Sequence, residues 1–238
     1  MRDEKEILKI EEHFDELSER CDEIDVRKEN VLMREIVKAL KDTMRRKELT
    51  SLSAPAIGYD KRIFCLNFSD VEIKTFINPI ITKAEGLDLA KEQCTSIPEK
   101  TFLRPRNTKV TVMYQTPTGA LENRQFIGLA AVRVQHEMDH LDGILLTDVG
   151  LEIDDDYEKA SEEEKAQVIE AYLDSLDLKR KSLKAEIEAD PDLKELDEGI
   201  RFMESVAKGE TKLERIPKEK QENLDNGETV SHQTETDD

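Results

Sequence analysis

The sequence lacks the features that mark secreted and membrane proteins. No run of apolar residues approaches the ~20 that a membrane-spanning helix needs, so we expect no membrane segment. The first 20 residues are highly charged and contain no apolar stretch of the kind found in secretion signals. Only three cysteines occur, at Cys21, Cys65 and Cys94, an odd number without the spacing of a disulfide framework. These absences predict a protein of the reducing cytoplasm.

Basic residues are scarce toward the C-terminus. Residues 151–238 contain 28 acidic and 13 basic residues, whereas residues 1–150 contain 27 acidic and 23 basic ones. The acidic region would repel nucleic-acid phosphate, so direct nucleic-acid binding is not expected. Charged residues make up 38% of the chain, which is high for a compact domain, and part of the chain should therefore lie outside the core.

Hydrophobic periodicity predicts helices at both ends and strands between them. Apolar residues three and four apart predict helices over 1–20 and 28–47, followed by a loop over 51–60. Strands are expected over 62–68, 74–82 and 109–115, with 121–127 as the hairpin partner of the last strand and a helix over 128–142. These elements predict an α+β domain over 28–150, preceded by a helical segment over 1–27.

After Asp148 the pattern becomes helical again. Ser161 to Glu164 has the form of a capping box, and two apolar stripes follow, separated by Asp190-Pro191. We expect an acidic helical hairpin over 151–208 and a disordered acidic tail over 209–238. The stripes within 157–207 suit self-association or a protein partner, although plain core packing or self-association is a commoner use of such stripes than a partner site.

Two of the four histidines lie in the stretch QHEMDHLDGILLTD, residues 135–148. Because residues four apart share one face of a helix, His136 and His140 can reach the same metal ion. Glu137 follows the first histidine, where its carboxylate can approach a water on that metal. The alternative is an exposed, charged helix in which the two histidines are incidental.

A catalytic metal site also needs a third protein ligand and an open position. Cys94, in the stretch KEQCTSIPEK, is the candidate, although a free cysteine is more often a small buried hydrophobic residue. The residues around Cys94 decide between these readings.

Three stretches, in this order, resemble the motifs of the peptide deformylase family. ELTSLSAPAIG at 48–58 is similar to the family loop GxGLAAPQxG, EQCTS at 92–96 to EGCLS, and QHEMDHLDG at 135–143 to QHExDHLxG. The third motif is intact over nine residues. The resemblance covers residues 31–148, and it includes neither the N-terminal 25 or so residues nor the acidic C-terminal region.

The resemblance implies an α+β fold with antiparallel strands around a central HExxH helix, and a metal held by Cys94, His136 and His140. Water would fill the fourth position, and Glu137 would act as general base and acid. The implied reaction removes the formyl group from the N-terminal formylmethionine of nascent polypeptides. The implied cofactor is one divalent metal, Fe(II) in the first place, with Zn(II) or Ni(II) as substitutes.

Two charged residues, Asp139 and Arg106, are candidates to orient the metal ligands. A surface ion pair is the alternative for them. Family members from bacteria often end in a basic helix that meets the ribosome. Because residues 151–238 are acidic here, that contact is not expected.

The first two motifs depart from the family pattern on the substrate side. Ser51 and Leu52 fall among the expected substrate contacts, with Ser51 in place of a glycine. Ala56 stands where the family has a glutamine whose amide binds the reaction's oxyanion, and losing one such donor costs about 10²–10³ in rate. The backbone N–H of Thr95 remains as a donor. Gln93 also replaces a glycine, and its amide is a hypothetical second donor.

Two other functions stay open on the sequence. The chain could be a catalytically weak or inactive relative that binds metal and acts through its C-terminal helices. It could also be an HExxH metalloprotease, although no distal third ligand is evident and Cys94 lies in a deformylase-like context.

Overall fold

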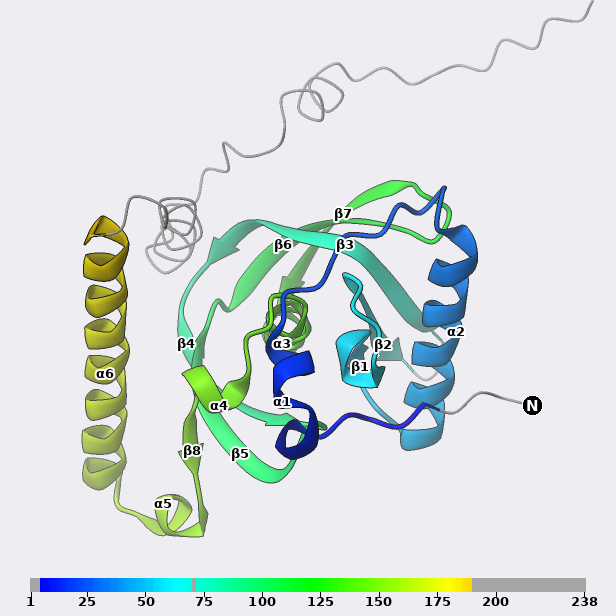
Figure 1. The fold of residues 1–238 in the computed structure, drawn as a ribbon. Coiled ribbons are helices and arrows are strands. Elements are labelled where there is room, and N and C mark those ends of the chain that lie inside the picture. Colours follow the sequence, from blue (N-terminus) through cyan, green and yellow to red (C-terminus); the bar gives the residue numbers. More distant parts are fainter. Residues whose placement is uncertain (1–4, 70–71, 190–238) are drawn as a thin grey trace, which may run out of the picture.

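The computed structural model describes residues 5–69 and 72–189. Two antiparallel sheets surround one central helix (Figure 1). The five-stranded sheet has the order β1-β2-β3-β6-β7, and the three-stranded sheet has the order β4-β5-β8. The strands are β1 (Ser51–Ser53), β2 (Ile63–Ser69), β3 (Glu72–Glu85), β4 (Asp88–Cys94), β5 (Ile97–Arg106), β6 (Lys109–Gln115), β7 (Leu121–Ile127) and β8 (Leu151–Ile153). The expected α+β fold is confirmed.

The helices are distributed around and within this frame. They are α1 (Ile10–Ser18), α2 (Asn30–Lys47), the short 3-10 helix η1 (Pro55–Ile57), α3 (Leu129–Leu141), α4 (Leu146–Val149), α5 (Asp155–Lys159) and α6 (Glu162–Ala189). The helix that carries the two histidines is α3, and it contacts β1, β2 and β7. In the part of the chain that the structure describes, no helix is both long and apolar enough to cross a membrane.

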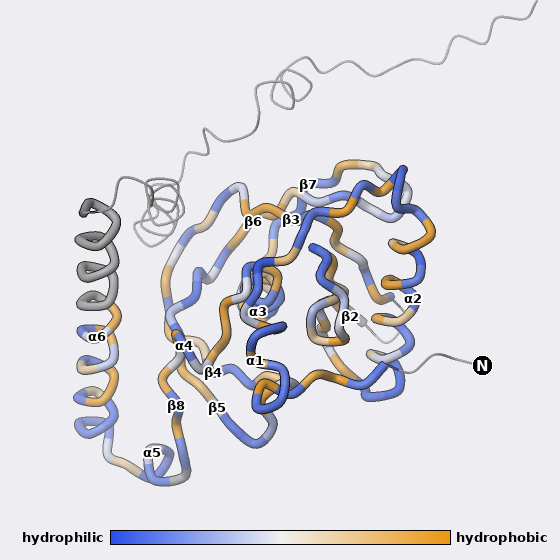
Figure 2. The backbone as a smooth tube through the Cα atoms, in the orientation of Figure 1, coloured by the Kyte–Doolittle hydropathy of each residue, from blue (hydrophilic) through white to orange (hydrophobic). Residues whose placement is uncertain are grey.

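Two apolar clusters hold the domain together. One joins α2 to the first strands through side chains such as Met33, Ile36, Leu40 and Leu52, and hydrophobic residues recur along α2 in Figure 2. The other packs α3 against β2, β3, β6 and β7, with Phe76 at its centre in ring contact with Phe64, Tyr114 and Phe126. Because this second cluster buries one face of α3, functional side chains can lie only on the opposite face.

Several predicted elements are confirmed. The hairpin of β6 and β7 spans the two predicted strands, β2 is shifted by one residue from its predicted range, and β3 contains its predicted segment. Helices α2 and α3 match their predicted ranges within two residues. The capping box is also present, because Ser161 N donates to Glu164 Oε2 at 2.8 Å and Glu164 N donates to Ser161 Oγ at 3.3 Å. This reciprocal pair starts α6 at Glu162.

Other predictions need correction. The helix expected over 1–20 is confined, among the described residues, to Ile10–Ser18. The segment before it bonds elsewhere instead, with Leu8 N donating to Ala56 O and Ile10 N to Ser96 O. The loop expected over 51–60 begins with a strand, because Ser51–Ser53 pair with β2. Strands β4 and β5 had no predicted counterpart.

The predicted boundary at residue 150 falls one residue before a strand. β8 begins at Leu151 and pairs with β5, so the three-stranded sheet extends past that boundary. Helix α6 stands beside the β4 side of the domain (Figure 1) and contributes Tyr172, whose hydroxyl donates to Val149 O at 2.6 Å. The second helix of the expected hairpin and the expected disordered tail lie outside the described residues.

Candidate metal centre

Helix α3 has one face in the core and one face toward the three-stranded sheet. Its apolar residues Ala131, Val134, Met138 and Leu141 belong to the core cluster around Phe76. Buried Gln135 fixes the helix along its axis, since its side chain bonds both the N–H and the carbonyl of Asn107. The opposite face carries His136 and His140, whose ring centroids are 5.0 Å apart. Packing of the apolar face therefore aims both imidazoles in one direction.

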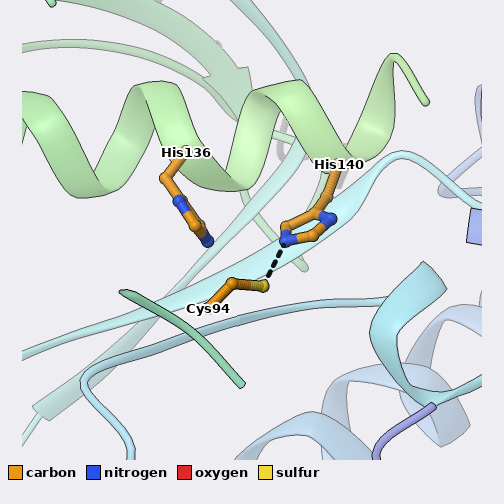
Figure 3. A group of neighbouring side chains, drawn as sticks. All are labelled: Cys94, His136 and His140. Carbon is orange, nitrogen blue, oxygen red and sulfur yellow. Dashed lines mark hydrogen bonds between the residues drawn. The ribbon is translucent and has the colours of Figure 1, made fainter. Parts of the chain in front are cut away.

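Cys94 meets the two histidines from the end of β4. Its Sγ lies 3.2 Å from His140 Nε2, and one ligand atom from each of Cys94, His136 and His140 lies within 4.8 Å of the others. Figure 3 shows the three side chains converging from the strand and the helix. The structure thus brings together the three residues that the sequence proposed as metal ligands, over a separation of 46 residues between Cys94 and His140.

The electrostatics of this cluster favour the thiolate. Burial alone would raise the pKa of the Cys94 thiol, but the adjacent imidazoles outweigh it and hold that pKa well below its ordinary value. Burial would lower the pKa of His136, yet hydrogen bonds with Cys94 and Glu92 raise it to about 10. Cys94 likewise outweighs burial at His140, where the pKa is raised. The thiolate is the form of cysteine that binds metal.

Glu92 is the site residue that sequence reasoning missed. Its carboxylate is 5% exposed and accepts a hydrogen bond from His136 Nδ1 at 2.8 Å. Arg106 donates to the same carboxylate from Nε at 2.7 Å and from Nη2 at 3.0 Å. Burial would raise the pKa of Glu92, but His136 and Arg106 hold it at about 2. The hydrogen bond from Nδ1 to Glu92 fixes the orientation of the His136 ring, so that Nε2 faces Cys94.

A buried ion network continues from Glu92. Arg106 is 4% exposed and also contacts Asp139, with Nη1 2.6 Å from Oδ2. Asp139 is bonded in addition by Arg104, a second residue that the sequence did not indicate. The alternative of a surface ion pair does not fit Asp139 and Arg106, because Arg106 is buried, the Asp139 side chain is only 17% exposed, and Arg106 is linked through Glu92 to His136.

Glu137 lies beside the cluster and is 4% exposed. It follows His136 directly in α3, and its charge adds a small contribution to the raised pKa values of both His136 and His140. Among the residues that the structure describes, no hydrogen-bond partner is found for the Glu137 carboxylate. The group is therefore available to a small molecule in the site.

The residues expected on the substrate side lie in or directly after two edge strands. Ser51 and Leu52 lie in β1, which is the edge strand of the larger sheet, and Leu52 is buried. Ala56 lies buried in η1, directly after β1. Thr95 belongs to the two-residue turn between β4 and β5, immediately after Cys94. β4 is the corresponding edge of the smaller sheet.

Gln93 does not point into the cluster. Neighbouring residues on a strand face opposite sides, and Gln93 is exposed whereas Cys94 is buried. The Gln93 amide donates to Thr101 Oγ1 at 3.1 Å across the β4–β5 hairpin. The hypothesis that this amide serves as an oxyanion donor finds no support in this geometry.

The donor set fits a divalent transition metal. One thiolate and two imidazoles are the ligand types of catalytic zinc sites and of related iron sites, and three protein ligands leave an open position. His140 Nδ1 is a buried nitrogen for which no partner is found among the described residues. His140 Nε2 faces Cys94, so the nitrogen that lacks a partner is the one turned away from the cluster.

Comparisons with known proteins place this chain in one family. A family model described as polypeptide deformylase matches residues 4–155. The peptide deformylase of Pseudothermotoga lettingae is 39% identical over 115 residues, covering 48% of this chain and 66% of that protein. The peptide deformylase of Thermodesulfovibrio yellowstonii is 34% identical over 146 residues, covering 60% of this chain and 88% of that protein.

Solved structures are similar to this chain as well. The class I type b peptide deformylase from Acinetobacter baumannii, crystallised with Met-Ala-Ser bound, aligns with a TM-score of 0.57 and 25% identity, covering 63% of this chain and 99% of that one. The family model begins at residue 4, so the family match extends into the N-terminal 25 or so residues that the motif resemblance did not include. Residues 5–27 pack into the domain, with Ile7, Leu17 and Ile24 all buried.

Proposed function

Because the chain belongs to the polypeptide deformylase family, a family of metal-dependent hydrolases, we propose that it removes the formyl group from the N-terminal formylmethionine of nascent polypeptides. The observation that carries the proposal is the convergence of Cys94, His136 and His140 beside buried Glu137. The family match favours this enzyme over a metal-binding protein without turnover.

Within this proposal, Cys94, His136 and His140 hold one divalent metal. We assign Fe(II) to the site in the first place, with Zn(II) and Ni(II) as metals that the same donors accept. A bound divalent metal supplies Lewis acidity, and it lowers the pKa of a water molecule that it binds. Glu92 orients His136 through its hydrogen bond to Nδ1. Arg106 and Asp139 hold Glu92 in turn.

The reaction then needs proton transfers by one group. Glu137 accepts a proton from the water that attacks the formyl carbon, and a tetrahedral intermediate forms. As the carbon–nitrogen bond breaks, Glu137 passes that proton to the leaving amine. The products are formate and a polypeptide with a free amino terminus. The low exposure of Glu137 keeps bulk water from competing for the proton.

The substrate backbone has an edge to pair with. An extended peptide can add to a free sheet edge, and β1 with Ser51 and Leu52 is such an edge in the described structure. The backbone N–H of Thr95 stands next to Cys94 as the donor for the oxyanion. Ala56 supplies no side-chain donor. The bound Met-Ala-Ser of the Acinetobacter baumannii protein supports a peptide with N-terminal Met as the ligand class.

The setting of the reaction is also part of the proposal. Nascent polypeptides place the enzyme in the cytoplasm, in agreement with the absences noted in the sequence. Contact with the ribosome through a basic C-terminal helix is not proposed, since α6 begins with Glu162, Glu163 and Glu164. Self-association or partner binding through 157–207 stays a prediction.

Deformylation of a short formyl-Met peptide tests the proposal. The protein would be purified without oxygen and loaded with Fe(II) or Ni(II), and release of formate would be followed. Glu137→Ala should retain one metal per chain and lose about 10²–10⁴ in kcat. A metal-loaded parent that releases no formate above the Glu137→Ala level would refute the proposal.

A further inference from the structure

The turn that follows Cys94 is held by the N-terminal segment. Cys94 pairs with Ile97, so Thr95 and Ser96 form a two-residue hairpin loop. Both carbonyls of this loop accept hydrogen bonds from residues 9 and 10. Lys9 Nζ donates to Thr95 O at 2.6 Å, and Ile10 N donates to Ser96 O at 3.0 Å. One segment, distant in sequence, thus bonds the two peptide groups that follow Thr95, namely Thr95–Ser96 and Ser96–Ile97.

The loop needs this support on conformational grounds. Two-residue hairpin loops favour turns with positive φ, which match the twist of the strands. Among described residues other than glycine, positive φ occurs only at Glu48, Asn78 and Glu99, so neither Thr95 nor Ser96 adopts it. The loop therefore lacks the favoured conformation, and outside hydrogen bonds contribute to its position.

The same N-terminal segment also touches the other wall of the site. Leu8 N donates to Ala56 O at 2.9 Å, and Ile10 packs against the small apolar cluster that contains Cys94 and Ile97. Lys9 lies between these two anchors, partly buried. In the described part of the chain, no carboxylate pairs with the Lys9 ammonium. Its charge is therefore directed at the Thr95 carbonyl without a competing partner.

We propose that Lys9 is a positioning residue for deformylation: by holding the Thr95 carbonyl it fixes the backbone of Thr95, and so keeps the adjacent Thr95 N–H where the oxyanion develops. The inference rests on the proposed function. A donor to an oxyanion acts only at hydrogen-bond distance from the place where charge develops. Ala56 adds no side-chain donor to the oxyanion. The rate therefore depends more strongly on the position of the Thr95 N–H than it would if an amide side chain also donated. A displacement on the scale of 1 Å is enough to cost about 10²-fold in rate.

Three variants of the full, metal-loaded chain test this role. Lys9→Met removes the ammonium and keeps much of the side-chain length, whereas Lys9→Arg keeps a charged donor. Lys5→Met is the matched control, because Lys5 belongs to the same segment but lies over the Tyr59 ring, 5.0 Å from its centroid. The readouts are kcat, KM and metal content, with hydrogen exchange of a peptide spanning residues 92–99 as a readout independent of activity.

We expect Lys9→Met to lower kcat at least tenfold with parent-like KM and metal content, and to exchange faster over 92–99. Lys9→Arg should recover most of kcat, and Lys5→Met should match the parent. An unchanged kcat in Lys9→Met overturns the inference. The inference is also overturned if kcat and bound metal are lost together in Lys9→Met and Lys9→Arg does not restore them, because Lys9 would then only support the fold.

A parent protein that does not hydrolyse the formyl peptide would refute the proposed function separately. Hydrogen exchange then decides the inference alone. Faster exchange over 92–99 in Lys9→Met, but not in Lys5→Met, would support the role of Lys9 in holding the loop after Cys94. Parent-like exchange in Lys9→Met would overturn it.

Discussion

Replacing Glu92 by glutamine should weaken both the fold and the metal centre. Glutamine keeps the shape of glutamate but removes the charge that accepts three hydrogen bonds, one from His136 and two from Arg106. A hydrogen bond to a charged group contributes about 1.5–3 kcal/mol and a neutral one about 0.5–1.5 kcal/mol. Each of the three bonds should therefore lose about 1 kcal/mol.

Glutamine adds a second cost at the same place. Its NH2 group must replace one carboxylate oxygen, and both oxygens of Glu92 face donors. The NH2 group of glutamine then faces an N–H donor of His136 or Arg106. The buried charge of Arg106 also loses one of the opposite charges that compensate it. The sum is about 3–4 kcal/mol of unfolding free energy, within the range of about 3–5 kcal/mol for breaking a buried ion pair. Losing the partner that orients His136 should lower metal affinity about 10- to 100-fold.

Chemical denaturation of the metal-free protein and metal competition with a chelator measure these two effects. Metal-free protein is needed because bound metal stabilises the folded state by itself. The matched control is Glu85→Gln, since Glu85 forms ion pairs with Lys83 and Lys109 at the surface, where such pairs contribute little. If Glu92→Gln has the denaturation midpoint and metal affinity of the parent, Glu92 does not support the centre and the reasoning is wrong.

Three further results are expected. Cys94→Ser should lose most of its bound metal in elemental analysis, because a hydroxyl is a poor ligand beside two imidazoles; full retention would point to another ligand set. Ala56→Gln should raise kcat for a formyl-Met peptide about 10²-fold by adding an oxyanion donor, and an unchanged kcat would show that an amide there cannot reach the oxyanion. Tyr172→Phe should cost about 1 kcal/mol by removing the bond to Val149 O, so limited proteolysis should cut α6 sooner while kcat is unchanged. Parent-like proteolysis would contradict this docking role of Tyr172.

The sequence predicted those elements whose buried residues are apolar. In β6, Val110, Val112 and Tyr114 are buried and alternate with less buried residues, and this alternation is the ordinary signal of a half-buried strand. β4 gives no such signal. Its buried residues are Glu92 and Cys94, both of them residues of the candidate site. A hydropathy pattern cannot reveal a strand whose buried face is built from polar, chemically active side chains.

The same geometry explains why Glu92 was missed. Residues two apart on a strand share one face, so Glu92 must face the same way as Cys94 once β4 is known to be a strand. The motif EQCTS contained this information, but it was unusable without the strand assignment. The candidate ligands on α3 were accessible from sequence because residues four apart share a helix face, and the helix itself was predictable from its apolar side.

The ion network has a positional role that its energy does not reveal. Buried ion pairs add little net stability over apolar residues of the same volume, yet removing one partner is costly. Here Glu92 comes from β4, Arg104 and Arg106 from β5, and Asp139 from α3. The apolar cluster around Cys94 has only four buried members, too few to define register by packing. Two carboxylates and two guanidiniums in fixed pairing define it instead, because a slip of the hairpin against α3 by one residue would leave buried charges without partners. The network thus sets where Cys94 stands relative to His136 and His140.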